Sequence, residues 1–150
     1  MSARPSSPAQ VYALVFGVIL AAAGIAGFFW SASFATGTGA SVEQGFLLGV
    51  LAVNGWHNVV HLLTGVVGLA VARDRSASRA YALGLGALYL VITLLGFIAS
   101  TNDTILGLVA INLEDNFLHL AIGLAGVGAG LATSTGPAQT REGETQTAAP

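Results

Sequence analysis

The chain lacks cysteine and lysine, and it has few charged residues of either sign. Without cysteine there is no disulfide, no thiolate metal site and no thiol nucleophile. Charged residues make up 8% of the 150 residues, and the formal net charge is -2. Soluble domains usually carry about a quarter charged residues, and nucleic-acid binding calls for a basic face. We therefore expect neither a soluble domain nor a nucleic-acid partner.

Apolar residues take the place of the missing charge. They make up 54% of the chain, and the mean hydropathy is +0.76. A helix needs about 20 apolar residues to cross a bilayer, and four apolar segments approach or exceed this length. The prediction is an all-α, integral membrane four-helix bundle, with the lipid bilayer as its environment. Its spans are about 11–34, 46–72, 80–99 and 104–132, between a polar tail at 1–10 and a disordered tail at 133–150.

The arginines predict the orientation of these spans. Arg73, Arg75 and Arg79 lie between the second and third spans, while Arg4 and Arg141 lie in the tails. The loops after the first and third spans contain no basic residue. Because basic loops stay on the cytoplasmic side, we expect both termini in the cytoplasm and a multi-pass topology.

Two halves of the chain resemble each other. At an offset of 69 residues, Tyr12-Ala-Leu14 matches Tyr81-Ala-Leu83. At an offset of 58 residues, six polar, glycine or leucine positions of the second span meet identical residues in the fourth. These positions are Asn54, Asn58, His61, Leu62, Gly65 and Gly68. The match predicts two tandem helical hairpins with the same direction in the membrane, related by an axis along the membrane normal.

Acidic residues indicate where the even helices begin. If the fourth span began at Thr104, Glu114 and Asp115 would lie about 15 Å deep, where charges are expensive. We expect the helix to start near Asn112 instead, with Asn112 as its N-cap and Asp115 in the first turn. By the internal repeat, the second helix is expected to start near Asn54. Segments 46–53 and 104–111 would then be re-entrant or interfacial, and continuous helices are the alternative.

Polar and glycine residues of these helices share one face. Such a stripe cannot face lipid, because its polar groups would have no partners there. Glycines allow helices to approach closely. We therefore expect the second and fourth helices to pack stripe to stripe, so that His61 meets His119 and His57 meets Asp115. The two stripes contain Asn54, His57, Asn58, His61, Gly65 and Gly68, and Asn112, Asp115, Asn116, His119, Gly123 and Gly126.

Several roles fit this cluster. Buried Asn and His side chains often only bond helices to one another, which predicts a structural or regulatory membrane component. The alternative is a divalent metal site, for zinc or a similar ion, formed by His57, His61, Asp115 and His119. Asn58 and Asn116 would bond to the ligands of such a site and orient the imidazoles.

Other roles for the histidines also remain open. His61 and His119 could hold haem b or a quinone, although no arginine lies near them to bind haem propionates. Proton relay through the histidines and Asp115 is a further hypothesis. No phosphate loop, serine–base pair or paired catalytic carboxylates are present, which disfavours an enzyme. The Gly126-x-x-x-Gly130 spacing is also compatible with a homo-oligomer.

The paired motifs carry a family resemblance. The motif His57-Asn58-x-x-His61-Leu-x-x-Gly65 and its counterpart Asp115-Asn-x-Leu-His119-Leu-x-x-Gly123 resemble those of a bacterial membrane family, the domain of unknown function 4383. The similarity extends from Tyr12 to Gly130. It implies four transmembrane helices in the bacterial plasma membrane and assigns no catalytic residue.

Overall fold

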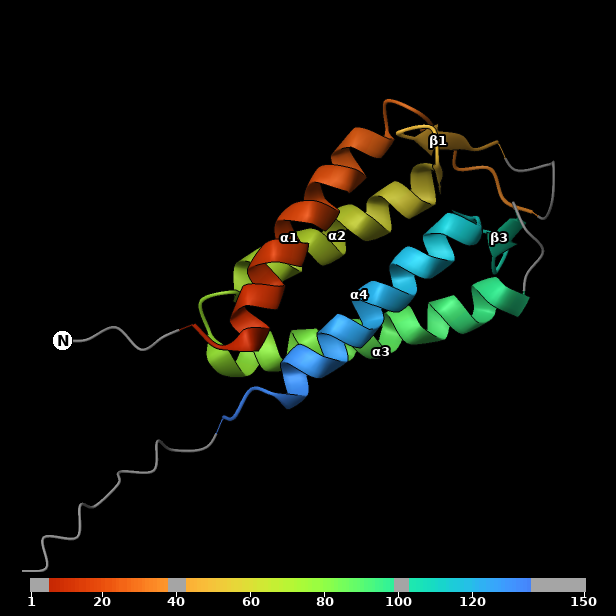
Figure 1. Cartoon of the computed structure of the whole chain (residues 1–150). Coiled ribbons are helices and arrows are strands. Elements are labelled where there is room, and N and C mark those ends of the chain that lie inside the picture. Colours follow the sequence, from red (N-terminus) through yellow and green to blue (C-terminus); the bar gives the residue numbers. More distant parts are fainter. Residues whose placement is uncertain (1–5, 38–42, 99–102, 136–150) are drawn as a thin grey trace, which may run out of the picture.

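The chain is mostly helical, as predicted. The computed structural model describes residues 6–37, 43–98 and 103–135. Within these ranges each half of the chain has a long helix, a short two-stranded hairpin and a second helix (Figure 1). The elements are α1 Pro8–Gly27, β1 Gly45–Leu47, β2 Leu51–Val53, α2 Gly55–Val71, α3 Arg75–Ile98, β3 Asp103–Ile105, β4 Val109–Ile111 and α4 Leu113–Leu131.

Helix packing follows the order of the chain. The most extensive contacts are between α1 and α2 and between α3 and α4, and these two pairs lie side by side in Figure 1. Two of the helices, α1 and α3, are long and apolar enough to cross a membrane, and α2 is a shorter apolar helix. The main buried apolar cluster, which includes Tyr12, Leu20 and Tyr89, lies where the two pairs meet.

The predicted stripe-to-stripe packing of α2 against α4 is wrong. Among the described residues these two helices have almost no close backbone contact. A Cβ on Gly65 would meet the backbone of Ala21 on α1, and a Cβ on Gly123 would meet Leu90 on α3. The glycines therefore allow close packing within each pair of helices, and the space between α2 and α4 is bridged by side chains.

Segments 46–53 and 104–111 are parts of antiparallel β-hairpins. In the first hairpin Leu47 pairs with Leu51, and the second has the equivalent register. The turn residues Leu48 and Gly49 both have positive φ angles, 56° and 77°, and Leu106 and Gly107 repeat this conformation. A pair of positive φ angles reverses a chain tightly and cannot continue a right-handed helix. The alternative of continuous helices is therefore wrong.

Helix ends also differ from the predicted spans. The first helix ends at Gly27 instead of continuing to residue 34, and the amides of Trp30 and Ser31 bond back to the Gly27 carbonyl. The third helix begins at Arg75, inside the basic loop, because the Asp74 carboxylate accepts the Ala77 amide at its first turn. The C-terminal part of the predicted tail at 133–150 lies outside the described residues.

Candidate metal centre

Two asparagines begin the helices that carry the histidines. The side-chain oxygen of Asn54 accepts the His57 amide at 2.9 Å, and that of Asn112 accepts the Asp115 amide at 2.9 Å. Both residues have the extended backbone expected of an N-cap. The predicted caps of the second and fourth helices are thus confirmed.

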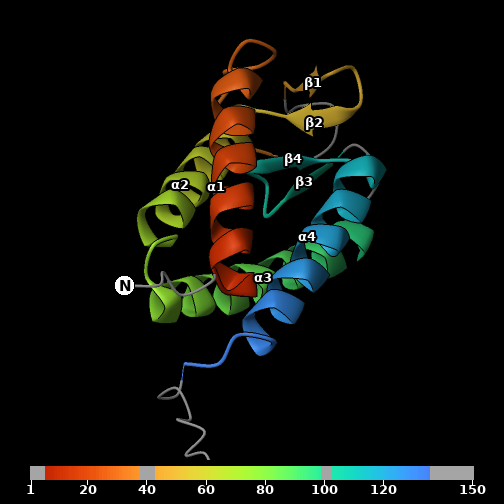
Figure 2. The same cartoon turned by 60° about the vertical axis from the view of Figure 1, so that its left-hand side comes forward.

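The same asparagines connect the two halves. The Asn54 side-chain amide donates to the Leu108 carbonyl of the second hairpin at 2.6 Å, and the Asn112 amide donates to the Val50 carbonyl of the first hairpin at 2.6 Å. Strands β2 and β4 are neighbours at this end of the molecule (Figure 2). Each helix start is therefore fixed to the hairpin of the other half.

Asp115 also bonds to both halves of the chain near the helix starts. Its Oδ2 accepts the Ala52 amide at 3.0 Å and the Asn112 amide at 3.1 Å. The second of these bonds completes a capping box with the Asn112 side chain. A buried carboxylate requires such partners, and here they are backbone groups, so Asp115 is not a member of the histidine group described next.

Three histidines converge between α2 and α4. One ring nitrogen from each of His57, His61 and His119 lies within 4.8 Å of the others. The Nε2 atoms of His57 and His61 are 3.0 Å apart, and the rings of His61 and His119 are 6.2 Å apart and nearly perpendicular. His57 and His119 are buried, whereas His61 is partly exposed. Three of the four side chains predicted as metal ligands are therefore brought together.

Backbone contacts fix the protonation of His57. Its Nδ1 lies 2.9 Å from the Ala52 carbonyl oxygen. Because a carbonyl can only accept, Nδ1 carries the proton and Nε2 keeps its lone pair. That lone pair points at His61, whose Nε2 then donates the proton of the 3.0 Å contact when no ion is bound. A carbonyl behind a ligating imidazole is the usual outer partner in metal sites.

His119 has an unused nitrogen inside the protein. Its Nδ1 is buried and, within the described part of the chain, has no hydrogen-bond partner. The ring packs against Tyr89, with centroids 4.9 Å apart, and the Tyr89 hydroxyl is also buried without a partner among these residues. Buried polar atoms without a partner are unfavourable. The His119 Nδ1 and the Tyr89 hydroxyl can therefore each still form a hydrogen bond.

Asn58 and Asn116 do not have the predicted role beside the imidazoles. The Asn58 amide donates to the Ser31 carbonyl at 2.8 Å, and its oxygen lies where a Cβ on Gly27 would be. The Asn116 oxygen occupies the equivalent place at Gly96. Asn58 therefore bonds to the backbone just after α1, and Asn116 packs against Gly96 near the end of α3.

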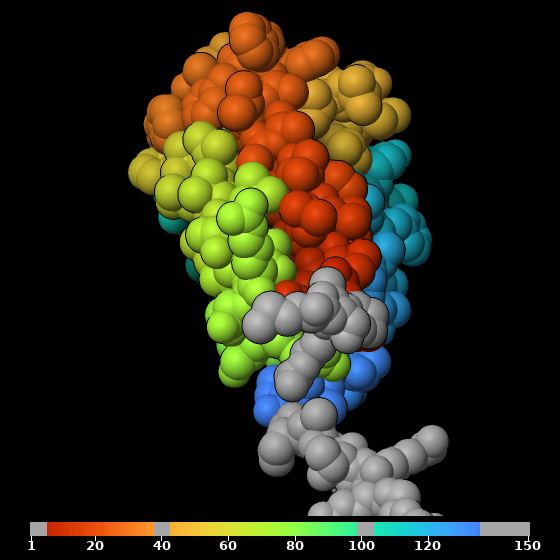
Figure 3. All heavy atoms as spheres, turned by 90° about the vertical axis from the view of Figure 1, so that its left-hand side faces the viewer, coloured from red at the N-terminus to blue at the C-terminus, as the bar shows by residue number. Residues whose placement is uncertain are grey.

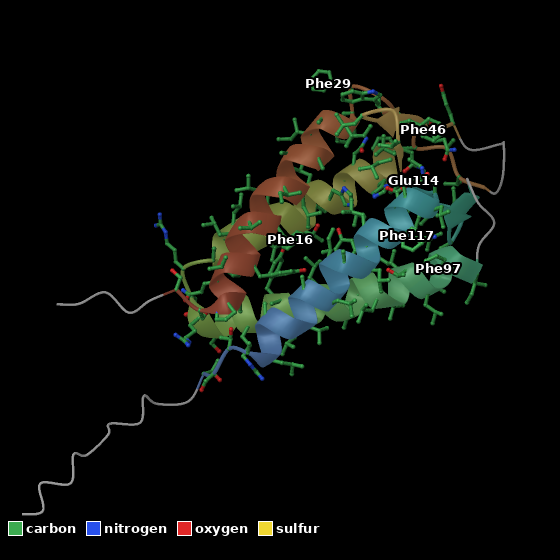
Figure 4. All side chains as sticks on the ribbon, viewed as in Figure 1. Phe16, Phe29, Phe46, Phe97, Glu114 and Phe117 are labelled. Atoms are coloured by element: carbon green, nitrogen blue, oxygen red, sulfur yellow. The ribbon has the colours of Figure 1, made fainter. Side chains whose placement is uncertain are left out.

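An apolar cavity of about 420 Å³ adjoins the histidines. It lies between α1 and α4 beside the β1–β2 hairpin. Its surface is almost entirely apolar, and His57, His61, Asp115 and His119 are among the residues that line it. Phe16 lies on α1 at the edge of the space between α1 and α4 (Figure 4) and lines the cavity. Sequence periodicity did not indicate this cavity or the role of the Ala52 backbone, because both depend on the unpredicted hairpins.

The comparison with known proteins places the chain in a family. No curated protein and no solved structure matches it. A family match covers residues 10–132, which include all the described helices except the first two residues of α1. The chain therefore belongs to the family described as Domain of unknown function (DUF4383).

Proposed function

We propose that the protein is an integral membrane protein that binds a divalent transition-metal ion, such as zinc, between His57, His61 and His119. The convergence of three imidazole nitrogens within 4.8 Å is the observation that carries this proposal. Proteins bind zinc with nitrogen ligands at about 2.0–2.1 Å, and three protein ligands leave a fourth position open. A tetrahedral ion would set neighbouring nitrogens about 3.3 Å apart by these bond lengths, close to the 3.0 Å between His57 and His61.

The distribution of polarity supports membrane insertion. Apolar side chains cover the outside of the helices, for example Leu14, Val18 and Ile25 of α1, each more than half exposed. Asn54, Asn58, His57 and His119 are instead buried. A water-soluble bundle has the opposite arrangement, and exposed apolar surface of this extent favours a lipid environment. Figure 3 shows the face on which α1 is flanked by the other helices.

Contacts at one end of the bundle support the proposed orientation. The Arg73 carbonyl accepts from Gln10, and Arg75 and Arg79 donate to the carbonyls of Ser134 and Gly130. The start of α1, the α2–α3 connection and the end of α4 therefore share a basic end, opposite the hairpins (Figure 1). By the positive-inside rule this end faces the cytoplasm.

Paired contacts support the proposal that the halves are repeats of one unit. The Tyr12 hydroxyl donates to the Ile122 carbonyl, and the Tyr81 hydroxyl donates to the Thr64 carbonyl. These four positions correspond under the two sequence offsets. His57 and Asp115 are also equivalent, and both bond to the backbone of Ala52. Only one half thus supplies a histidine at this position, which gives three ligands in place of four.

A haem fits this geometry poorly. A macrocycle between His61 and His119 would have to displace His57, whose Nε2 lies 3.0 Å from that of His61. A single ion needs a change of tautomer at His61, whose proton can be on Nδ1 instead of Nε2, so that Nε2 offers a lone pair. The third nitrogen must approach the other two by about 1–1.5 Å to reach zinc bond lengths.

Elemental analysis of the protein purified in mild detergent tests this proposal. We expect about one zinc per chain, and loss of the metal from His61→Gln and His119→Gln. Thr64→Ala is the matched control, because the Thr64 hydroxyl bonds to the Val60 and His61 carbonyls of its own helix and its side chain is not one of the three ligands. Protein that carries no zinc after incubation with the ion would favour the metal-free alternative, in which the His61–His57 hydrogen bond joins a structural polar core.

A further inference from the structure

The cavity beside the histidines is apolar and adjoins the candidate metal centre. Its lining is apolar over α1 and the β1–β2 hairpin, through residues such as Leu20, Ala23 and Val53. The three histidines, whose ring nitrogens lie within 4.8 Å of one another, also line it. An apolar cavity beside a bound ion would complement an amphiphile, with the cavity holding the apolar part and the ion holding the polar head.

We infer that this cavity binds an amphiphile with one hydrocarbon chain and an anionic oxygen head, such as a long-chain carboxylate. The chain lies along α1, and the head occupies the open position of the metal ion. This inference rests on the proposed function, because the ion supplies the positive charge that the head requires.

The size of the cavity favours one chain. An apolar cavity of about 150 Å³ is sufficient for benzene, and small-molecule sites range from about 300 to 1,000 Å³. At about 420 Å³ the cavity has room for a single extended chain rather than for the paired chains of a phospholipid.

The mouth of the cavity is apolar as well. The lining residues Ile19, Leu48 and Leu118 are 49%, 77% and 42% exposed, and all three are aliphatic. In a membrane-embedded bundle such an opening between α1 and α4 meets lipid tails instead of water. A ligand would therefore enter from the bilayer, where single-chain amphiphiles are dissolved.

Charge balance favours an anionic head. Three neutral imidazoles leave the two positive charges of the ion uncompensated, and the Asp115 side chain is bonded to the backbone amides of Ala52 and Asn112 instead of belonging to the ligand group. An unbalanced charge in an apolar interior is strongly unfavourable. A carboxylate oxygen can take the fourth ligand position and reduce this imbalance.

The test uses a photoreactive palmitate analogue and the full chain in lipid nanodiscs. Zinc content is measured on the same samples. We expect labelled peptides from α1 and the β1–β2 hairpin, with labelling reduced about tenfold in Ala23→Phe, whose ring occupies the cavity. Ile25→Phe is the matched control, because Ile25 lies on the exposed side of α1 and does not line the cavity. Leu118→Trp at the mouth is a second blocking variant.

The outcomes separate this inference from the proposed function. Zinc-loaded protein whose labelling is the same in wild type, Ala23→Phe and Leu118→Trp overturns the inference and leaves the metal site intact. Labelling that persists after zinc is removed by a chelator overturns the assignment of the head to the ion. Protein that binds no zinc overturns both. Competition by phosphatidic acid as strong as that by palmitate would contradict a single-chain ligand.

Discussion

At the scale of single residues, Asn54 and Asn112 each have two functions. The oxygen of each side chain caps its own helix, and the nitrogen bonds to the hairpin of the other half. An amide side chain is required for this, because only Asn offers both an acceptor and two donors on so short a side chain. The positions of the histidines depend on these two residues, since His57 follows Asn54 by one turn.

Substitution of Asn54 separates its two functions. Asn54→Asp keeps the cap but replaces the donor to the Leu108 carbonyl with an oxygen, whereas Asn54→Ala removes both interactions. We expect the alanine variant to lose about 1 kcal/mol for the cap and about 0.5–1.5 kcal/mol for the hydrogen bond. Thermal unfolding in detergent measures the stability of both variants. An unfolding midpoint of Asn54→Ala equal to that of wild type would contradict this assignment.

Gly27 and Gly96 are predicted to tolerate no side chain. A Cβ at either position would overlap the side-chain oxygen of Asn58 or Asn116. We expect Gly27→Ala and Gly96→Ala to destabilise the protein by about 1–3 kcal/mol. Gly84→Ala is the control on α3, because a Cβ there meets nothing within 4 Å, and it should be neutral or stabilising by about 0.5–1 kcal/mol. Equal effects of the three substitutions would refute this packing.

The residue pattern predicted part of the site correctly. The caps and the convergence of His61 with His119 follow from helical spacing and from the matching motifs. The partners of Asp115 and of the glycines could not be predicted in this way. Spacing along a helix shows which residues share a face, but several neighbouring helices compete for that face, and Gly65 and Gly123 proved to face α1 and α3.

At the scale of elements, both hairpins contain a strained leucine. Leu48 and Leu106 have φ angles of 56° and 54°, and their side chains are 77% and 83% exposed. This conformation costs roughly 1–2 kcal/mol for a residue with a Cβ. The same conformation and the same exposed leucine therefore recur at both hairpin tips, at the end of the bundle opposite the arginines.

Relief of this strain should stabilise the second hairpin. Asn adopts positive φ angles more readily than Leu, so Leu106→Asn is expected to raise the unfolding free energy by up to about 1 kcal/mol. Val50→Asn in the first hairpin is the control, because Val50 is exposed but does not have a positive φ angle. Chemical denaturation in detergent provides the comparison, and a destabilised Leu106→Asn would show that the apolar tip contributes more than its strain removes.

At the scale of the whole molecule, the proposed topology can be tested with single cysteines, because the chain has none of its own. Ser76, beside the basic connection, is exposed, and Leu106 lies at the other end. We expect an impermeant thiol reagent applied to intact cells to modify Leu106→Cys but not Ser76→Cys, and to modify both in opened membranes. The reverse labelling would invert the orientation.

Composition predicted the helical architecture well, because four long apolar segments with almost no charge leave few alternatives. The hairpins were missed because Phe46, Leu51 and Val53 are apolar residues that suit a membrane helix equally well. Only the Leu-Gly pairs that form the turns distinguish these segments, and they gave no recognisable turn signal such as Asn-Gly.

A three-imidazole metal centre inside the bundle is the central feature proposed for this protein. X-ray absorption at the zinc edge of the purified wild-type protein tests this directly. The proposed centre would have three nitrogen ligands at about 2.0–2.1 Å with the scattering pattern of imidazole rings, from His57, His61 and His119. Zinc surrounded only by oxygen ligands, or an unchanged spectrum in His119→Gln, would contradict it.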